Sequence, residues 1–325
     1  MSVHGAARAA LLCSAALAVV GCASRGPVLE PLLVGGQSQR IELDATPFFP
    51  QDRYQCGPAA LATVLAAAAV DVQVDSLVSE VYLPGRQGSL QPELIAATRR
   101  HDRVPYALPP SIGALLAALE GGYPVLVLQK LGAGPFPGWH YAVVVGYDAA
   151  RDQLVLRSGT VRRKEMSARD FLATWDRAGR WALLTVQPGA LPPAADFTRY
   201  MEAVAGLEAV GRRDAAALAY ETAARQWPAE SLPQLALANL AYARGDLVTA
   251  ERGFHAAVRL DPEDAAARNN RAELLRQMGC ITLARKEVAI ARTLAADGPL
   301  AAAVDATARE VAAQPDGDAV GCPAD

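Results

Sequence analysis

The chain has 325 residues, more than one hydrophobic core usually organises, so two domains are the default expectation. Its formal net charge of −3 at pH 7 gives no reason to expect a nucleic-acid partner. Its 5 cysteines and 4 histidines do not gather at metal-ligand spacing, so the sequence predicts no zinc site and no cofactor.

The N-terminal residues have the pattern of a secretion signal. Arg8 precedes the apolar run Ala9–Val20, which is too short for a stable membrane span and is followed by Gly21-Cys22. This ending resembles the lipobox of bacterial lipoproteins. The resemblance implies that Cys22 becomes the acylated N-terminus, and Ala23 after it favours attachment to the outer membrane at its periplasmic face. A signal peptide cut near Ala23 without lipidation is the alternative.

Residues 1–21 are therefore assigned to a lipoprotein signal peptide. Residues 22–45 contain Gly, Ser, Gln and Pro and show little hydrophobic periodicity, which is typical of a tether. The acyl chains on one residue would anchor such a chain to a membrane.

A cysteine lies where a loop passes into an apolar helix predicted over residues 57–70. At a helix N-terminus the unpaired N–H groups and the positive end of the dipole stabilise a thiolate, so the pKa of Cys56 is expected to fall from about 8.5 toward neutrality. Gly57 lets the backbone approach a substrate, and Pro58 suits the first helical turn. From this position alone, a nucleophile and a buried structural cysteine are equally good interpretations.

Beyond this helix the pattern alternates between helix and strand. Short turns join the later strands, which favours an α+β domain with an antiparallel sheet. The basic run Arg162-Arg163-Lys164 is interpreted as a solvated loop. Further helices are predicted at 91–101 and 110–120, and strands at 123–129, 140–147, 153–158 and 181–186.

His140 decides between the two interpretations of the cysteine. It begins an apolar, β-branched run that ends at Tyr147 and is predicted to be a strand. A cysteine on a helix start and a histidine on a distant strand form the arrangement in which an imidazole takes the thiol proton and later protonates the leaving amine. Gln51 is expected to donate, together with the N–H of Cys56, to the oxyanion of the tetrahedral intermediate. Gln55 is the second candidate for that role.

These residues also resemble a known family. Gln51, Cys56-Gly57 and the segment from His140 to Tyr147 are similar to the glutamine, cysteine and histidine boxes of the bacteriocin-processing, double-glycine leader peptidases, which are papain-like. The resemblance covers roughly residues 45–190. It implies an α+β papain-like cysteine peptidase domain in which Gln51 is the oxyanion donor, Cys56 the nucleophile and His140 the general base.

The chain departs from that family at the fourth catalytic position, where an aspartate is usual and this sequence has Ser158-Gly159. If Tyr147 pairs with Gln153 across the hairpin turn, Ser158 falls opposite Ala142, near the histidine. Ser158 is therefore predicted to orient the imidazole. A neutral hydroxyl stabilises imidazolium less than a carboxylate does, so we expect either a slower enzyme or an acid that reaches in from elsewhere.

The Pro-rich stretch 187–193 is expected to mark a domain boundary that few contacts cross, so the peptidase domain is assigned to residues 46–190. After it the chain is rich in alanine and almost wholly helical. Gly211, Gly245 and Gly279 recur 34 residues apart, and several alanines follow the same step.

That period, with small residues where paired helices touch, resembles tetratricopeptide repeats and predicts an all-α solenoid. Three repeats are assigned to residues 196–298, and a capping helix with a tail to residues 299–325. Cys280 and Cys322 lie in this region. A disulfide between them suits an oxidising periplasm, although their spacing alone does not test it.

Two classes of function compete. The first is a lipid-anchored periplasmic cysteine peptidase that hydrolyses peptide bonds and whose repeats recruit a protein substrate or partner. The second is a non-catalytic envelope scaffold, in which the repeats act and the papain-like domain binds peptides without cutting them. Acyl or amide transfer by the same thiol is a third reading that uses identical residues. Gln51, Cys56 and His140 together favour the peptidase.

Overall fold

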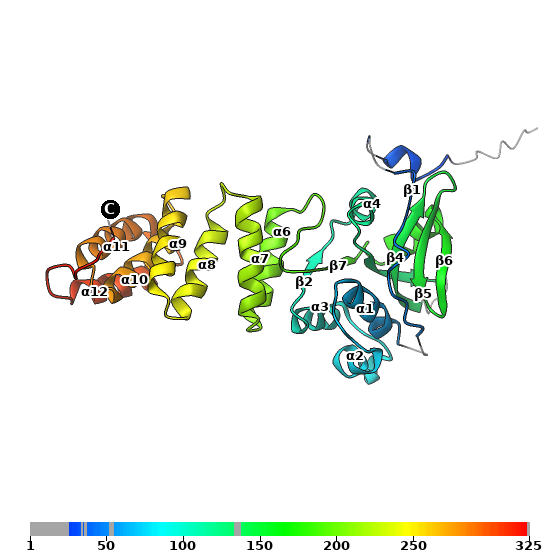
Figure 1. Ribbon diagram of the computed structural model, residues 1–325, viewed down its shortest axis with the longest axis horizontal. Helices are drawn as coiled ribbons and strands as arrows, with labels where there is room; N and C mark the ends of the chain where they lie inside the picture. The colour runs from blue at the N-terminus through cyan, green and yellow to red at the C-terminus, as the bar shows by residue number, and fades with distance from the viewer. Residues whose placement is uncertain (1–25, 34, 36–37, 52–54, 133–137, 324–325) are drawn as a thin grey trace, which may run out of the picture.

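The computed structural model describes residues 26–323 apart from 34, 36–37, 52–54 and 133–137. Cys22, the predicted lipidation site, and the signal peptide lie outside these residues. The described chain forms a sheet-containing N-terminal domain followed by a row of helices (Figure 1). This confirms the fold class expected from the sequence.

The N-terminal domain contains a seven-stranded sheet among the described residues, and every pairing in it is antiparallel. Six strands follow the order β2-β7-β3-β4-β5-β6, and β1 pairs with one end of β4. The strands are β1 (Arg40–Glu42), β2 (Val104–Ala107), β3 (Val125–Leu131), β4 (Gly138–Asp148), β5 (Gln153–Ser158), β6 (Val161–Ser167) and β7 (Ala182–Val186).

Helices cover both faces of this sheet. Along β4 the side chains alternate, so that Tyr141 and Val143 pack into the apolar cluster that contains α1, whereas Ala142 and Val144 pack into the cluster on the opposite face. The helices of this domain are α1 (Cys56–Ala67), α2 (Val74–Val81), α3 (Gln91–Arg100), α4 (Ile112–Glu120) and α5 (Ala168–Asp176), with short 3₁₀ turns η1 (Glu30–Leu32) and η2 (Pro84–Arg86).

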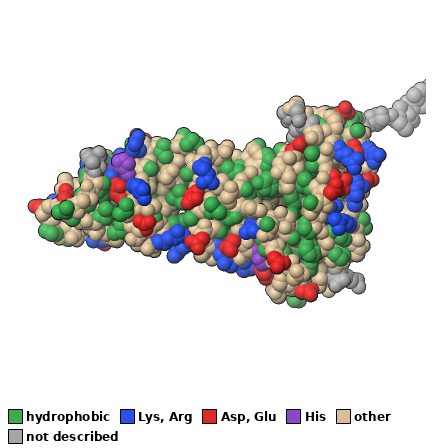
Figure 2. All heavy atoms as spheres, in the orientation of Figure 1, with side chains coloured by type: hydrophobic (Ala, Val, Ile, Leu, Met, Phe, Trp, Pro, Cys, Tyr) green, Lys and Arg blue, Asp and Glu red, His purple; other side chains and the backbone are tan. Residues whose placement is uncertain are grey.

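The basic run at residues 162–164 lies in β6 and not in a loop, so that interpretation of the sequence was wrong. β6 is the last strand in the sheet order, and Arg163 pairs with Glu42 and Glu165 across its exposed surface. Figure 2 shows basic and acidic side chains gathered over this end of the molecule. Charged residues are a usual way to protect a sheet edge from further pairing, and they remove the apolar alternation by which a strand is recognised.

The folded domain begins before residue 46. Leu29 is fully buried in the main apolar cluster, and β1 pairs with β4 from Arg40 onward. The segment expected to be a tether is therefore partly built into the sheet domain.

The second region consists of α6 (Phe197–Ala209), α7 (Arg213–Gln226), α8 (Leu232–Ala243), α9 (Leu247–Leu260), α10 (Ala265–Gln277), α11 (Ile281–Ala295) and α12 (Ala301–Ala312). Gly211, Gly245 and Gly279 end the turn within each helix pair, with φ of +79°, +77° and +77°. Only glycine adopts this left-handed conformation without a steric cost, which is why the glycine recurs with the repeat.

The boundary between the two regions carries many contacts, contrary to expectation. Tyr200, Val204 and Leu207 of α6 lie in the same apolar cluster as Tyr106 of β2, and Tyr220 of α7 joins them. The first helix pair therefore completes the core of the sheet domain, because it covers apolar residues that the sheet and α4 leave open.

The end of the chain folds back onto the last repeat. A disulfide joins Cys280 to Cys322, and the carboxylate of Asp318 accepts a hydrogen bond from the backbone N–H of Thr282 at 2.8 Å. Of the helices that the structure describes, none is long and apolar enough to span a bilayer.

Candidate active site

The thiol of Cys56 lies at the first residue of α1, after Gln55 as N-cap. Every residue from Gly57 to Leu65 is buried, and the apolar side chains among them pack against the sheet. A Cβ atom on Gly57 would lie 2.3 Å from Oγ of Ser89. Glycine is therefore required here by the close approach of the segment before α3, a packing reason that the sequence did not reveal.

The β4–β5 hairpin determines which residues meet at the other side of the site. Tyr147 pairs with Leu154, one residue further along β5 than expected. A bulge at Val145 then cancels this difference, and beyond it Val143 pairs with Arg157 as the expected register requires. The last residue of β5 therefore lies beside the first residues of β4.

The structure brings His140 and Ser158 together in this way. Nε2 of His140 lies 2.8 Å from Oγ of Ser158, and Ser158 is only 7% exposed. The hydroxyl occupies one ring nitrogen and fixes the orientation of the imidazole. Nδ1 is then the nitrogen that can take a proton from a thiol.

Backbone groups surround the sulfur of Cys56. The N–H groups of Tyr141, Gly57 and Cys56 itself hydrogen-bond the sulfur and favour its thiolate. The pairing between β4 and β5 ends at Val143. The backbone of Tyr141 therefore has no β5 partner on that edge of β4, and this edge can face the start of α1. The sequence carries no signal for the Tyr141 contact, because every residue except proline has a backbone N–H.

The electrostatic state of the pair differs from expectation. Burial raises the pKa of the Cys56 thiol by more than the three N–H groups lower it. Burial, with a smaller contribution from the charge of Lys164, lowers the pKa of His140 to about 4. Both shifts favour the neutral forms, so at neutral pH the site rests as thiol and imidazole. The predicted fall in the pKa of Cys56 is therefore wrong.

Gln51 lies against the end of β5. Its backbone N–H donates to the carbonyl oxygen of Gly159 at 3.3 Å, and a Cβ atom on Gly159 would lie 3.5 Å from its Nε2. With Ser158 and Tyr141 it lines a small hollow of about 10 Å³, too small for a substrate. Gln51 is thus on the Ser158 side of the site, whereas Gln55 is next to the thiol at the N-cap.

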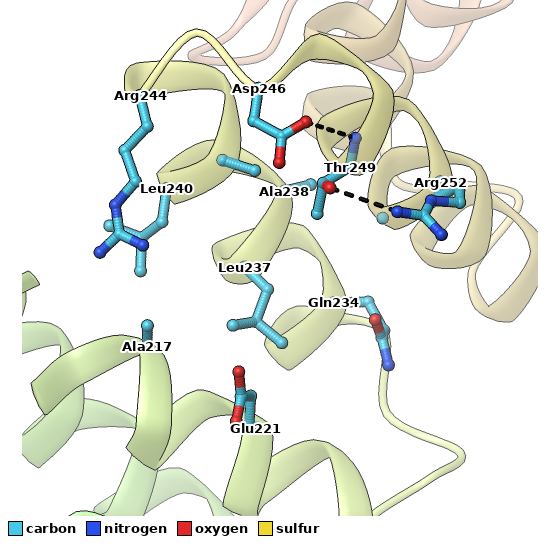
Figure 3. Close-up of a pocket in the computed structure, with 12 residues that line it drawn as sticks. Ala217, Glu221, Gln234, Leu237, Ala238, Leu240, Arg244, Asp246, Thr249 and Arg252 are labelled. Atoms are coloured by element: carbon cyan, nitrogen blue, oxygen red, sulfur yellow. Dashed lines mark hydrogen bonds between the residues drawn. The ribbon is translucent and has the colours of Figure 1, made fainter. Parts of the chain in front are cut away.

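Larger hollows lie on the helical repeats. One of about 410 Å³ is lined by α7, α8 and α9, with Leu237 at its floor (Figure 3). Glu221, Gln234 and Arg252 lie around that leucine. This hollow combines an apolar floor with a charged rim, and it is separate from the thiol.

The helix-borne thiol and the strand-borne imidazole belong to a fold of the papain-like class. Residues 42–183 match the model of the Peptidase C39 like family. The N-terminal domain therefore resembles the C39-like peptidases, and the all-helical region after it resembles tetratricopeptide repeats. No protein of curated function matches the sequence.

Solved structures resemble each region separately. A putative C39-like peptidase from Bacillus anthracis is 18% identical over 46% of this chain and 98% of its own, with a TM-score of 0.39. The peptidase domain of Streptococcus ComA is 22% identical over 44% of this chain and 99% of its own, with a TM-score of 0.35. The Yersinia enterocolitica type III secretion translocator chaperone SycD is 18% identical over 36% of this chain and 83% of its own, with a TM-score of 0.34.

Proposed function

We propose that the protein is a lipid-anchored periplasmic cysteine peptidase, in which Cys56 is the nucleophile and His140 the general base. The observation that carries this proposal is the 2.8 Å contact of Ser158 with Nε2 of His140, together with the N–H of Tyr141 at the sulfur of Cys56. The first contact holds the imidazole of His140 by one nitrogen, and the second places the thiol of Cys56 beside Tyr141, the residue that follows His140 in the chain.

The chemistry proceeds from a neutral pair. As the sulfur of Cys56 attacks the substrate carbonyl carbon, its proton passes to Nδ1 of His140, so charge separation occurs only during attack. The imidazolium then protonates the leaving amine, and the C–N bond breaks to give an acyl-enzyme. Water, deprotonated by the same imidazole, releases the acid. The N–H groups at the thiol and the amide of Gln51 supply hydrogen bonds to the oxyanion.

The repeats recruit a protein substrate or partner in this proposal. Stacked helix pairs offer extended surfaces to other chains, and the hollow above Leu237 fits an apolar side chain with polar groups around it. The C39-like and tetratricopeptide parts share one core, so a bound partner is held at a fixed position relative to Cys56.

The location rests on two observations. The sequence ending in Gly21-Cys22 has the form of a lipoprotein signal. From this form we infer that Cys22 is acylated and that the protein is attached to the outer membrane. The disulfide between Cys280 and Cys322 suits an oxidising compartment such as the periplasm.

The proposal is tested by searching for new peptide N-termini. The wild-type protein and its Cys56→Ala variant are incubated with a mixture of unfolded proteins, and mass spectrometry identifies N-termini that depend on the thiol. A peptide aldehyde should form an adduct on Cys56 in the wild type, and this adduct should become much weaker in His140→Ala. If the folded wild type yields no thiol-dependent N-termini, hydrolysis is excluded.

A second function is favoured by two observations. The raised pKa of Cys56 and the serine in place of an acid suit a domain that binds peptides without cutting, within an envelope scaffold. Peptide binding of equal affinity in wild type and Cys56→Ala, without cleavage, would support it. Acyl transfer is recognised in the same experiment by adding an amine and finding it attached to the new C-termini.

A further inference from the structure

The described N-terminal segment is fastened to the tip of the β4–β5 hairpin. Oδ1 of Asp152 accepts hydrogen bonds from the backbone N–H groups of Val28 and Leu29 at 2.8 and 2.9 Å. The side chain of Leu29 is fully buried. A carboxylate that takes two backbone N–H groups beside a buried leucine is a specific fastening rather than an incidental contact.

A second fastening follows a few residues later. Oε1 of Glu120 accepts from the backbone N–H of Ser38 at 2.8 Å and from the hydroxyl of Tyr147 at 2.6 Å. β1 then pairs with the same end of β4, Arg40 opposite Asp148. The segment is thus held at the hairpin end of the sheet at three successive places.

The active site lies at the other end of β4. His140 is near the beginning of that strand, and the hairpin turn follows Asp148, so the two ends are about 26 Å apart at the usual strand rise. In Figure 1, η1 lies at the top of the view and α1 in its lower half, while the row of repeats extends sideways from the sheet. The chain therefore enters the fold on the side remote from the thiol.

Val28 is the sixth residue after Cys22, and six fully extended residues span at most about 20 Å. We infer that the hairpin end, with η1 and the exposed side chain of Arg151, faces lipid headgroups, and that Cys56 opens on the side away from the membrane. This inference rests on the proposed acylation of Cys22. It makes the substrates polypeptide segments that stand clear of the bilayer, and it excludes segments embedded in the bilayer or lying flat on it.

The test places a photo-crosslinking residue in the full, lipidated protein on vesicles of phosphatidylethanolamine and phosphatidylglycerol. Position 151 samples the hairpin tip, and position 139, which is 57% exposed, samples the active-site end. Lipid adducts are counted by mass spectrometry after illumination. At least tenfold more lipid adducts are expected at 151 than at 139. Asp152→Ala should reduce that ratio, because it releases Val28 and lengthens the free tether.

Asp148→Ala is the matched control, because the hydrogen bond and the ion pair of the Asp148 side chain stay within the turn, to the backbone N–H and the guanidinium of Arg151. Its pairing with Arg40 is made by the backbone and is kept in the variant. The ratio should be unchanged in this variant. Equal or reversed adduct counts in membrane-bound protein would overturn the orientation while leaving the anchor intact. Protein that stays in solution with Cys22 present would overturn both the anchor and the orientation. Peptidase activity is measured separately on the soluble Cys22→Ala form, so that the proposed function is tested independently of the anchor and of the orientation.

Discussion

At the scale of single residues, the main property of the site is that both partners are held neutral. Burial penalises thiolate and imidazolium alike, and no acidic side chain contacts His140 among the described residues to offset this penalty. Ser158 supplies orientation without charge. Such a pair separates charge only when a substrate is present, which limits reactivity toward small thiol reagents.

The pH dependence follows from these shifts. His140 must be neutral to accept the proton, and its pKa of about 4 means that turnover should persist down to about pH 4 and fall tenfold for each unit below. Alkylation of Cys56 by iodoacetamide should keep rising above pH 9, because the pKa of the thiol is raised. Both are measured as second-order rates against pH.

Lys164→Gln tests the electrostatic origin of the acid limb in the pH profile of turnover. Removing this charge should raise the pKa of His140 and move the acid limb upward, whereas Arg163→Gln, which breaks a pairing with Glu42 outside the site, should leave it in place. An acid limb near pH 6.5 in the wild type would contradict a desolvated imidazole.

The role of Ser158 is tested by a pair of substitutions. Ser158→Ala should lower kcat about fivefold, because an oriented hydrogen bond is worth roughly 1 kcal/mol. Ser158→Asp should raise kcat and move the acid limb upward, since a carboxylate stabilises imidazolium. Ser76→Ala on α2 is the control for loss of a serine hydroxyl. Unchanged kinetics in both Ser158 variants would remove the residue from the mechanism.

The two glutamines are distinguished by the same kind of comparison. Gln51→Ala should cost about 100-fold in kcat with little change in KM, because an oxyanion donor acts only in the transition state. Gln55→Ala should have a small effect. The opposite result would assign the donor to Gln55 at the N-cap, next to the thiol.

At the scale of helices and strands, the repeat depends on the backbone conformation of its turn glycines. No atom lies within 4 Å of a Cβ built on Gly245, so a side chain meets strain and not crowding. Gly245→Val should therefore lower stability by about 1–2 kcal/mol, and Gly245→Asn by less, because asparagine tolerates φ above zero. Thermal unfolding of the two variants measures the difference. Equal losses would point to a packing role instead.

The elements that the sequence predicted well are those buried on both faces, whose apolar residues follow one another almost without interruption. α1, β4 and β5 have long apolar patterns, and the hairpin register was sufficient to place Ser158 because the bulge at Val145 cancels the one-residue error. β6 was missed because its exposed positions are charged, and β2 because Pro105 and its four-residue length resemble a turn.

Part of the site could not be predicted for a different reason. Two contacts depend on where the backbone lies in the folded domain: that of the Tyr141 N–H with the sulfur, and that of Ser89 with Gly57. No residue type in the sequence predicts either of them. The pKa of Cys56 was predicted in the wrong direction because the helix dipole was considered without burial, and burial is a property of the folded domain.

At the scale of the whole molecule, the functional unit is larger than the peptidase domain that the sequence delimits. α6 and α7 cover Tyr106 and neighbouring apolar residues of the sheet, so a fragment ending near residue 195 should expose that surface and aggregate. A fragment ending near residue 228 keeps both helices and should remain soluble, with Cys56 still reactive to the peptide aldehyde. Size-exclusion chromatography and adduct mass spectrometry measure these properties. A soluble, reactive shorter fragment would restore the boundary near residue 190.

The shared core also has a consequence for the order in which the protein folds. One apolar cluster takes side chains from Leu29 at the start of the described chain and from Leu240 in α8. This core cannot assemble before residues up to α8 are present. Individual helices therefore form early, and the sheet becomes fully packed only when helices distant in sequence reach it. An unfolded chain therefore exposes its apolar sheet face until the first helix pair packs against it. We expect the chain to be most open to aggregation and proteolysis during that interval.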